Sequence, residues 1–295
     1  MEYYISQLIN GICQGAIYAL MAIGYSVIVG VVGMVNFTYG EVMMLGAYTA
    51  YYCFNYFAGN LFVGIISAFL GSFFIGIFVY KTCYEHFFNA PRHIPLLCTI
   101  GVSMLLKNLA QIIFGPNTKP VQGIVNNKVF TVAIFGTNIY VLWLQIIIIA
   151  IVIVLAISLN LFINRSKYGI MLRAVSQDKH AAYLMGINVK WTVMLGNCLG
   201  CALGGVAGIL LALYYYLVSP LMGSSYTMKA FAASVLGGLV DIRFSAIGGL
   251  CLGIIENLGI TISSATFRDV FAFGFLILVL IIRPQGFKSK KGTKA

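Results

Sequence analysis

The acidic, histidine and cysteine side chains are the groups of this sequence that can support catalysis or metal binding. The seven acidic residues include no pair at i, i+3 or i+4 spacing, and the chain holds no H-E-x-x-H, G-x-S-x-G or P-loop motif. Cys198 and Cys201 form a C-x-x-C, but no second cysteine pair or nearby histidine completes a set of zinc ligands. His86, His93 and His180 are scattered along the sequence. We therefore expect no enzyme active site, no metal site and no cofactor in this chain.

The composition is that of a membrane protein. Of the 295 residues, 61% are hydrophobic and 8% are charged, and the mean hydropathy is +0.97. Soluble domains carry about 25% charged residues. Unbroken apolar runs such as Leu142 to Ile163 predict helices, because the strands of a membrane barrel alternate apolar and polar residues. The sequence predicts an all-α integral membrane protein with a single transmembrane domain over residues 1–295.

The apolar runs predict a bundle of about nine spans, within a range of about eight to ten. They lie at about residues 5–31, 34–57, 61–80, 95–115, 139–162, 191–217, 227–240, 246–263 and 269–283. Most of the 18 basic residues fall in 81–94, 163–190 and the basic tail 283–295, which are therefore expected in the cytoplasm. We interpret the formal charge of +11 as this topology signal, with tail contact to anionic membrane lipid as an alternative, and not as nucleic-acid binding.

One predicted helix break lies in VGVVGMVNFTYGEVMMLGAY (Val29 to Tyr48), which places Asn36, Thr38 and Glu41 within an apolar run. Glycine costs a helix about 1 kcal/mol relative to alanine, and an unpartnered carboxylate inside a membrane costs several times more. Two interpretations are open. Asn36 or Thr38 caps the next helix with Glu41 completing the cap in its first turn, or Glu41 contacts a substrate beside a translocation path.

A second break is expected in LVSPLMGSSYTMKAFAASVLGG (Leu217 to Gly238). Its polar stretch runs from Ser219 to Thr227, includes Ser224 and Ser225, and precedes a short helix. This break faces the outside in the predicted topology, whereas the first faces the cytoplasm. Two similar units of opposite orientation suggest an inverted repeat, an architecture that lets a central path open to either side in turn.

Glycine recurs at every fourth position of one predicted span, at Gly196, Gly200, Gly204 and Gly208. These positions share one helix face, and a face without side chains lets a neighbouring helix approach closely. We predict a helix-packing seam there, in a tight bundle.

The loop 163–190 is too short to fold alone and too polar to enter lipid. Ser176 is a candidate N-cap of a short helix, with Asp178 in its first turn and Gly186 at its end. A small apolar face is expected from four residues, Ala181, Ala182, Leu184 and Met185. Such a helix fits a groove on a partner protein, and a solvated connecting loop is the alternative.

Four segments of the chain resemble the permease subunits of branched-chain amino acid ABC importers. They are NGICQGAIYALMAIGYSVIVGVVGMVNFTYGEVMMLGAY (Asn10 to Tyr48), RAVSQDKHAAYLMGINV (Arg173 to Val189), KAFAASVLGGLVDIRFSAIGGLCLGIIENL (Lys229 to Leu258) and IIRPQGF (Ile281 to Phe287). They occur in the order expected for that family and cover about a third of the chain. One departure is VDIRFS (Val240 to Ser245), where the family usually has a short stretch with glycine or proline.

The resemblance implies a permease in the bacterial plasma or inner membrane, with a cytoplasmic C-terminus. Its expected partners are a second related permease, two cytoplasmic ATPases, an extracytoplasmic substrate-binding protein and a small-molecule substrate, namely a branched-chain or related amino acid. The loop 163–190 corresponds to the place where the ATPase docks in that family. An ion-coupled secondary transporter is the main alternative, since it would use the buried carboxylates Glu41 and Glu256. A channel fits poorly, because no ring of charges or repeated filter sequence is present.

Overall fold

The computed structural model describes residues 2–56, 59–88, 90–91, 93–121, 129–134, 137–262, 264 and 267–282. The basic tail 283–295 lies outside these residues. The helices are α1 (Glu2–Val32), α2 (Tyr39–Tyr56), α3 (Leu61–Tyr80), α4 (His93–Phe114), α5 (Trp143–Arg165), α6 (Lys167–Gln177), α7 (Lys179–Leu184), α8 (Val189–Tyr215), α9 (Met222–Gly237), α10 (Ile242–Ile262) and α11 (Arg268–Ile282). The π-helix η1 (Lys81–Glu85) continues α3, and four short strands are β1 (Lys119–Pro120), β2 (Val129–Ile134), β3 (Thr137–Leu142) and β4 (Leu217–Val218). The chain is thus a nearly all-α protein.

Six of the described helices are long and apolar enough to cross a membrane. These segments are Tyr4–Val32, Leu61–Glu85, His93–Phe114, Trp143–Arg165, Val189–Tyr215 and Ile242–Thr261. The other three predicted spans correspond to α2, α9 and α11, whose lengths are 18, 16 and 15 residues. The structure therefore supports a multi-pass membrane protein and leaves the count of nine a prediction. No described feature supports the inverted repeat.

The bundle is built around α1 and α8. Their most apolar windows are 94% and 83% buried, whereas those of α4 and α5 are each 22% buried. Helix α1 packs mainly against α10 and α8, and α8 also packs against α3 and α2. Glycine permits the close approach of α1 to α10, because a Cβ at Gly15 would overlap the backbone of Leu250. The helices around this core carry many exposed apolar side chains, as a membrane-embedded surface requires.

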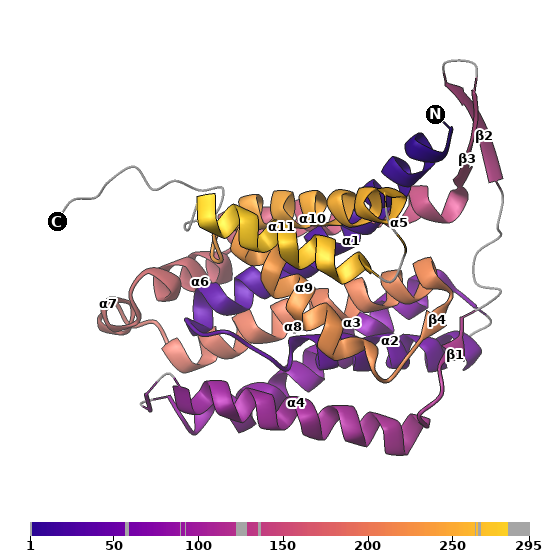
Figure 1. The fold of residues 1–295 in the computed structure, drawn as a ribbon. Coiled ribbons are helices and arrows are strands. Elements are labelled where there is room, and N and C mark those ends of the chain that lie inside the picture. Colours follow the sequence, from indigo (N-terminus) through magenta and orange to yellow (C-terminus); the bar gives the residue numbers. More distant parts are fainter. Residues whose placement is uncertain are drawn as a thin grey trace.

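The two ends of the bundle carry different elements. Figure 1 shows α6 and α7 at one end and the hairpin of β2 and β3 at the other. Strand β2 pairs antiparallel with β3, and β1 pairs antiparallel with β4, which joins the chain after α4 to the chain after α8. This arrangement places the loop 163–190 and the hairpin of β2 and β3 at opposite ends of the bundle.

Each of the two turns that flank α9 contains a residue other than glycine in the left-handed backbone conformation. Tyr216, with φ 57°, ends α8, and Gly238 and Leu239, with φ 95° and 66°, end α9. The turn at Leu239 leads into the VDIRFS stretch, where Asp241 Oδ1 accepts the N–H of Arg243 as α10 begins. A tight turn therefore forms there, with Gly238 and the non-glycine residue Leu239 both in the left-handed region.

Candidate functional site

The first predicted break is a partly buried coil over residues 33–38. Asn36 and Thr38 are fully buried, and Asn36 Oδ1 accepts the backbone N–H of Thr38 at 2.9 Å and its hydroxyl at 2.5 Å. The N–H of Asn36 reaches the Tyr25 hydroxyl at 3.3 Å, and the N–H of Phe37 reaches Thr99 Oγ1 at 3.4 Å. Side chains of α1 and α4 thus bind backbone groups that lipid cannot hydrate.

Glu41 lies in the first turn of α2 and is 1% exposed. Neither of its carboxylate oxygens has a hydrogen-bond partner among the described residues. The hypothesis that Glu41 completes a cap is therefore wrong, whereas Asn36 accepts hydrogen bonds from Thr38 just before the helix. The carboxylate packs instead against the first turn of α9, since a Cβ at Gly223 would overlap it. The N–H of Gly40 also donates to Thr227 Oγ1 of α9 at 3.0 Å.

The predicted polar break before α9 is shorter than expected. Helix α9 already begins at Met222, so Ser224 and Ser225 lie in its first turns and not in a loop. Both are exposed, next to the buried Gly223 that contacts Glu41. The sequence analysis therefore placed these serines near a break, as the structure does, but expected a polar break where the structure has a helix.

Helix α4 also packs against α2, and Figure 1 shows it along the lower edge of the bundle, below α2. Lys107 of α4 is half-buried and interacts electrostatically with Glu41, but it forms no salt bridge with a described residue. Further along α2, the Tyr48 ring stacks on Phe114 at 4.3 Å while its buried hydroxyl has no described partner. We call Glu41, Tyr48 and Lys107 the α2–α4 site.

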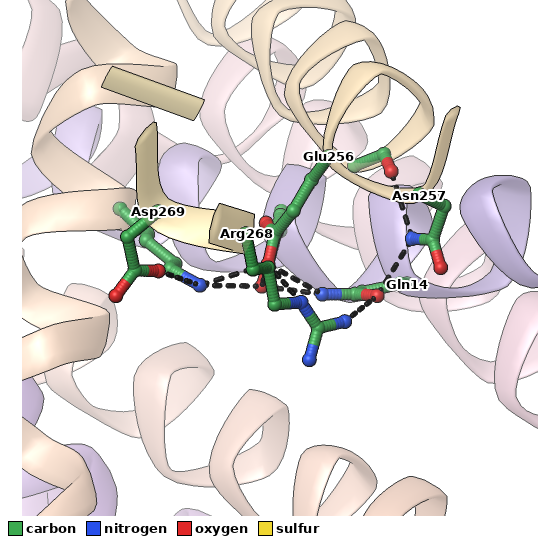
Figure 2. Close-up of polar contacts among 8 residues, drawn as sticks. Gln14, Glu256, Asn257, Arg268 and Asp269 are labelled. Atoms are coloured by element: carbon green, nitrogen blue, oxygen red, sulfur yellow. Dashed lines mark hydrogen bonds and ion pairs between the residues drawn. The ribbon is translucent and has the colours of Figure 1, made fainter. Parts of the chain in front are cut away.

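A second group of buried charges lies between α1, α9, α10 and α11 (Figure 2). Glu256 is fully buried, and its Oε1 lies 2.9 Å from Lys229 Nζ and forms an ion pair with Arg268. Lys229 Nζ also lies 2.9 Å from Asp269, whose side chain is 60% exposed. Two cations therefore balance two anions in this charge cluster.

Neutral side chains complete the charge cluster. Gln14 Nε2 and the Tyr18 hydroxyl donate to Glu256 Oε1 at 3.3 and 3.2 Å, and Asn257 Nδ2 donates to Gln14 Oε1 at 2.7 Å. Lys229 also lies over the Tyr18 ring, 5.6 Å from its centroid. The sequence analysis named Glu256 and missed the other members of the cluster. A lysine and a glutamate each lie within an apolar run, and burying an unpaired charge inside a membrane is costly, so their presence could have indicated an ion pair.

The docking loop forms two helices whose caps differ from the prediction. Ser176 is not an N-cap, because it lies in the last turn of α6 and its hydroxyl donates to Arg173 O at 2.8 Å. Asp178 is the N-cap of α7 and accepts the N–H groups of His180 at 2.8 Å and Ala181 at 3.1 Å. These N–H groups, Ala181 first, hold the pKa of Asp178 below its usual range.

The exposed apolar face of α7 differs from the predicted one in one residue. Ala182 is 4% exposed, so it packs inside this chain and does not face a partner. Ala181 is exposed, and Leu184 and Met185 are 71% and 82% exposed. Gly186, with φ 82°, follows the end of α7 as predicted. A hollow of about 1050 Å³ adjoins α7, lined by residues from two segments, 85–90 and 179–190.

Comparison with known proteins decides the family. Residues 7–280 match a family model described as branched-chain amino acid transport system / permease component. The chain belongs to this permease family. It is 34% identical over 293 residues to the high-affinity branched-chain amino acid transport system permease protein BraD of Pseudomonas aeruginosa, covering 96% of this chain and 95% of the relative. It is also 34% identical over 295 residues to the permease protein LivH of Escherichia coli, which has the same description and the same coverage. It is 30% identical over 287 residues to a probable branched-chain amino acid transport permease protein LivH of Methanocaldococcus jannaschii, covering 92% of this chain and 86% of the relative.

The glycine seam of the permease contacts α1, α2 and α6. A Cβ at Gly196 would meet Leu172 of α6 and Val31 of α1, and one at Gly200 would meet Ile28 of α1. A Cβ at Gly204 or Gly208 would meet α2, at Tyr39 and Met43 respectively. The seam therefore holds α8 against both helices that flank the coil 33–38, which fixes where α2 begins.

Proposed function

We propose that this permease is the membrane subunit of an ATP-binding-cassette importer. With a second related permease, it forms the path by which branched-chain or related amino acids cross the membrane. The observation that carries this proposal is similarity over 96% of the chain to proteins whose names state branched-chain amino acid transport. The sequence has no P-loop, so ATP hydrolysis is assigned to two separate cytoplasmic subunits. An extracytoplasmic binding protein delivers the substrate.

Helix α7 is the proposed contact for the ATPase. Its outer surface presents Tyr183, Leu184 and Met185, which are 69%, 71% and 82% exposed. Three adjacent large apolar side chains on a loop outside the membrane-spanning helices favour burial against a partner. Asp178 and Gly186 define the two ends of α7, so these side chains are held on a short rigid element.

The proposed orientation places the α6–α7 end in the cytoplasm, together with the tail 283–295. The basic residues of this loop, Arg165, Lys167, Arg173, Lys179 and Lys190, support this side. We infer nine crossings, in which α2 and α9 are short because each begins at a break inside the bundle. Glu41 lies at one of these breaks, beside the proposed translocation path.

The test is uptake of radiolabelled leucine into vesicles that contain the permease with its co-purified partner chains and the binding protein. We expect uptake that requires ATP inside the vesicles, persists with ionophores present and is absent with ADP. An ion-coupled secondary transporter would instead take up leucine with this chain alone, driven by a sodium or proton gradient. That result would overturn the proposal.

A further inference from the structure

Helix α2 carries buried polar atoms that lack partners in the described structure. Both carboxylate oxygens of Glu41 and the hydroxyl of Tyr48 are in this position, and the two residues are 1% and 0% exposed. Seven residues separate them, so they share one face of the helix about 10 Å apart along its axis. Buried polar groups without partners are rare in native proteins, because each costs on the order of 1–3 kcal/mol. Their presence on one face points to a ligand.

Lys107 supplies a charge of opposite sign across from this face. It lies within α4 and is flanked one turn away on each side by half-buried Ser103 and Gln111. A lysine within a membrane helix is costly when it faces lipid, so this flank of α4 is expected to border a polar path. Lys107 and Glu41 interact electrostatically, yet they do not approach within the 4.0 Å of a salt bridge. The two charges are therefore near enough to interact but are not paired in this structure.

The start of α9 adds positive potential on the same side of α2. Gly223 of its first turn packs on the Glu41 carboxylate, and no side chain caps the helix at Leu221. The N-termini of α2 and α9 therefore both lie close to Glu41, and free N–H groups at a helix N-terminus stabilise a nearby anion.

We propose that the α2–α4 site binds the zwitterionic head of the transported amino acid. Glu41 binds the α-ammonium group, Lys107 binds the α-carboxylate, and the Tyr48 hydroxyl is a further hydrogen-bonding group. A ligand with adjacent positive and negative charges satisfies both protein charges at once, whereas a ligand with one charge leaves the other buried and unpaired. The assignment rests on the proposed function. Because the Glu41 carboxylate packs on Gly223 in this structure, ligand entry requires the first turn of α9 to separate from α2.

The experiment measures ligand binding to the complete transporter in lipid nanodiscs without the binding protein. Three probes share one apolar side chain: leucine, 4-methylpentanoate, which lacks the ammonium group, and leucinamide, which lacks the carboxylate. We expect the wild-type transporter to bind leucine at least tenfold more tightly than either analogue. In Glu41→Gln the preference over 4-methylpentanoate should disappear, and in Lys107→Met the preference over leucinamide should disappear.

Matched controls keep this test decisive. Glu85→Gln and Lys167→Met change exposed residues near the α6–α7 end and should retain both preferences. The unfolding midpoint of each unliganded variant shows whether it remains folded. A folded Glu41→Gln transporter that still prefers leucine to 4-methylpentanoate overturns the site. Leucine uptake by the wild type is measured separately, so its absence contradicts the proposed function while the binding preferences still decide the site.

Discussion

Replacing Glu256 by glutamine tests whether the charge cluster stabilises the bundle. Glu256 Oε1 forms ion pairs with Lys229 and Arg268 and accepts hydrogen bonds from Gln14 and Tyr18. Glutamine keeps the size and one acceptor oxygen but removes the negative charge. Two cations then remain inside the bundle, and the carboxylate left to them belongs to Asp269, which is 60% exposed.

The expected cost follows from burial. Removing one partner of a buried ion pair costs about 3–5 kcal/mol, because an uncompensated charge is left behind. The introduced glutamine would still accept hydrogen bonds from its neutral neighbours, so we expect the lower limit, about 3 kcal/mol. Exposed pairs contribute about 0–1 kcal/mol, so Asp269→Asn should cost about 1 kcal/mol or less. The double variant Glu256→Gln, Lys229→Met restores the charge balance and should be more stable than the sum of the single changes by about 1 kcal/mol or more.

The assay is the thermal unfolding midpoint of the purified permease in detergent with lipid. At about 2–4 °C per kcal/mol, Glu256→Gln should lower the midpoint by roughly 6–12 °C, while Asp269→Asn changes it by a few degrees at most. If both variants unfold within about 2 °C of the wild type, the cluster contributes no more than exposed ion pairs do and the reasoning is refuted.

Four further predictions follow from individual contacts. Met185→Asp should leave the unfolding midpoint unchanged, because Met185 is 82% exposed, but should lower ATPase retention in pull-downs at least tenfold. Gly204→Leu should destabilise the permease by about 1–3 kcal/mol or more, measured by the same midpoint, since its Cβ meets an aromatic ring of α2. The pKa of Asp178 is lower in the folded chain, so its cap stabilises α7 above the unfolded-state pKa of about 3.9 and is lost as pH falls through the folded value. Protection of the amides in the first turn of α7, measured against their intrinsic exchange rate at each pH, should fall over that range. Cysteines at Tyr183 and Asn117 should be labelled from opposite faces of the membrane.

The membrane class and the positions of the helices could be predicted from the sequence, because each apolar run reports its own burial in lipid. The interruptions at 33–38 and before α9 were also visible, since glycine and polar residues oppose a helix locally. The sequence could not show how the backbone at these breaks is satisfied. The partners of the first coil are Tyr25 and Thr99, which lie on other helices.

Predictions from local sequence were wrong where tertiary contacts decide which of two similar residues takes a given role. Ser176 and Asp178 are both good N-cap residues, and α6 extends far enough that Asp178 takes the cap of α7. Ala182 belongs to the same helix as the exposed Leu184, but α7 packs against α6 and α8 and buries the alanine. Substituting arginine at Ala182 would therefore disturb folding, and it cannot serve as a clean test of docking.

The members of the charge cluster could not be matched to one another from the sequence, for a different reason. Its members come from four helices, and Gln14 and Asp269 are separated by most of the chain. No periodicity in one segment indicates which buried lysine meets which buried glutamate. Only the packing of α1 on α10 and of α9 on α10 brings Lys229 and Glu256 together.

Helix α7, the proposed ATPase contact, is linked to Glu41 through a short stretch of chain. Lys179 Nζ of α7 donates to Val32 O, the last residue of α1, at 2.7 Å. The coil 33–38 follows directly, and its side-chain hydrogen bonds end at the first turn of α2, where Glu41 lies. Helix α1 is held by packing along its length, whereas the middle of this coil, 34–37, is held in the described structure by side-chain hydrogen bonds and not by helical ones. A displacement of α7 by a bound ATPase would therefore be taken up first by the coil, and so would change the position of Glu41 relative to α9.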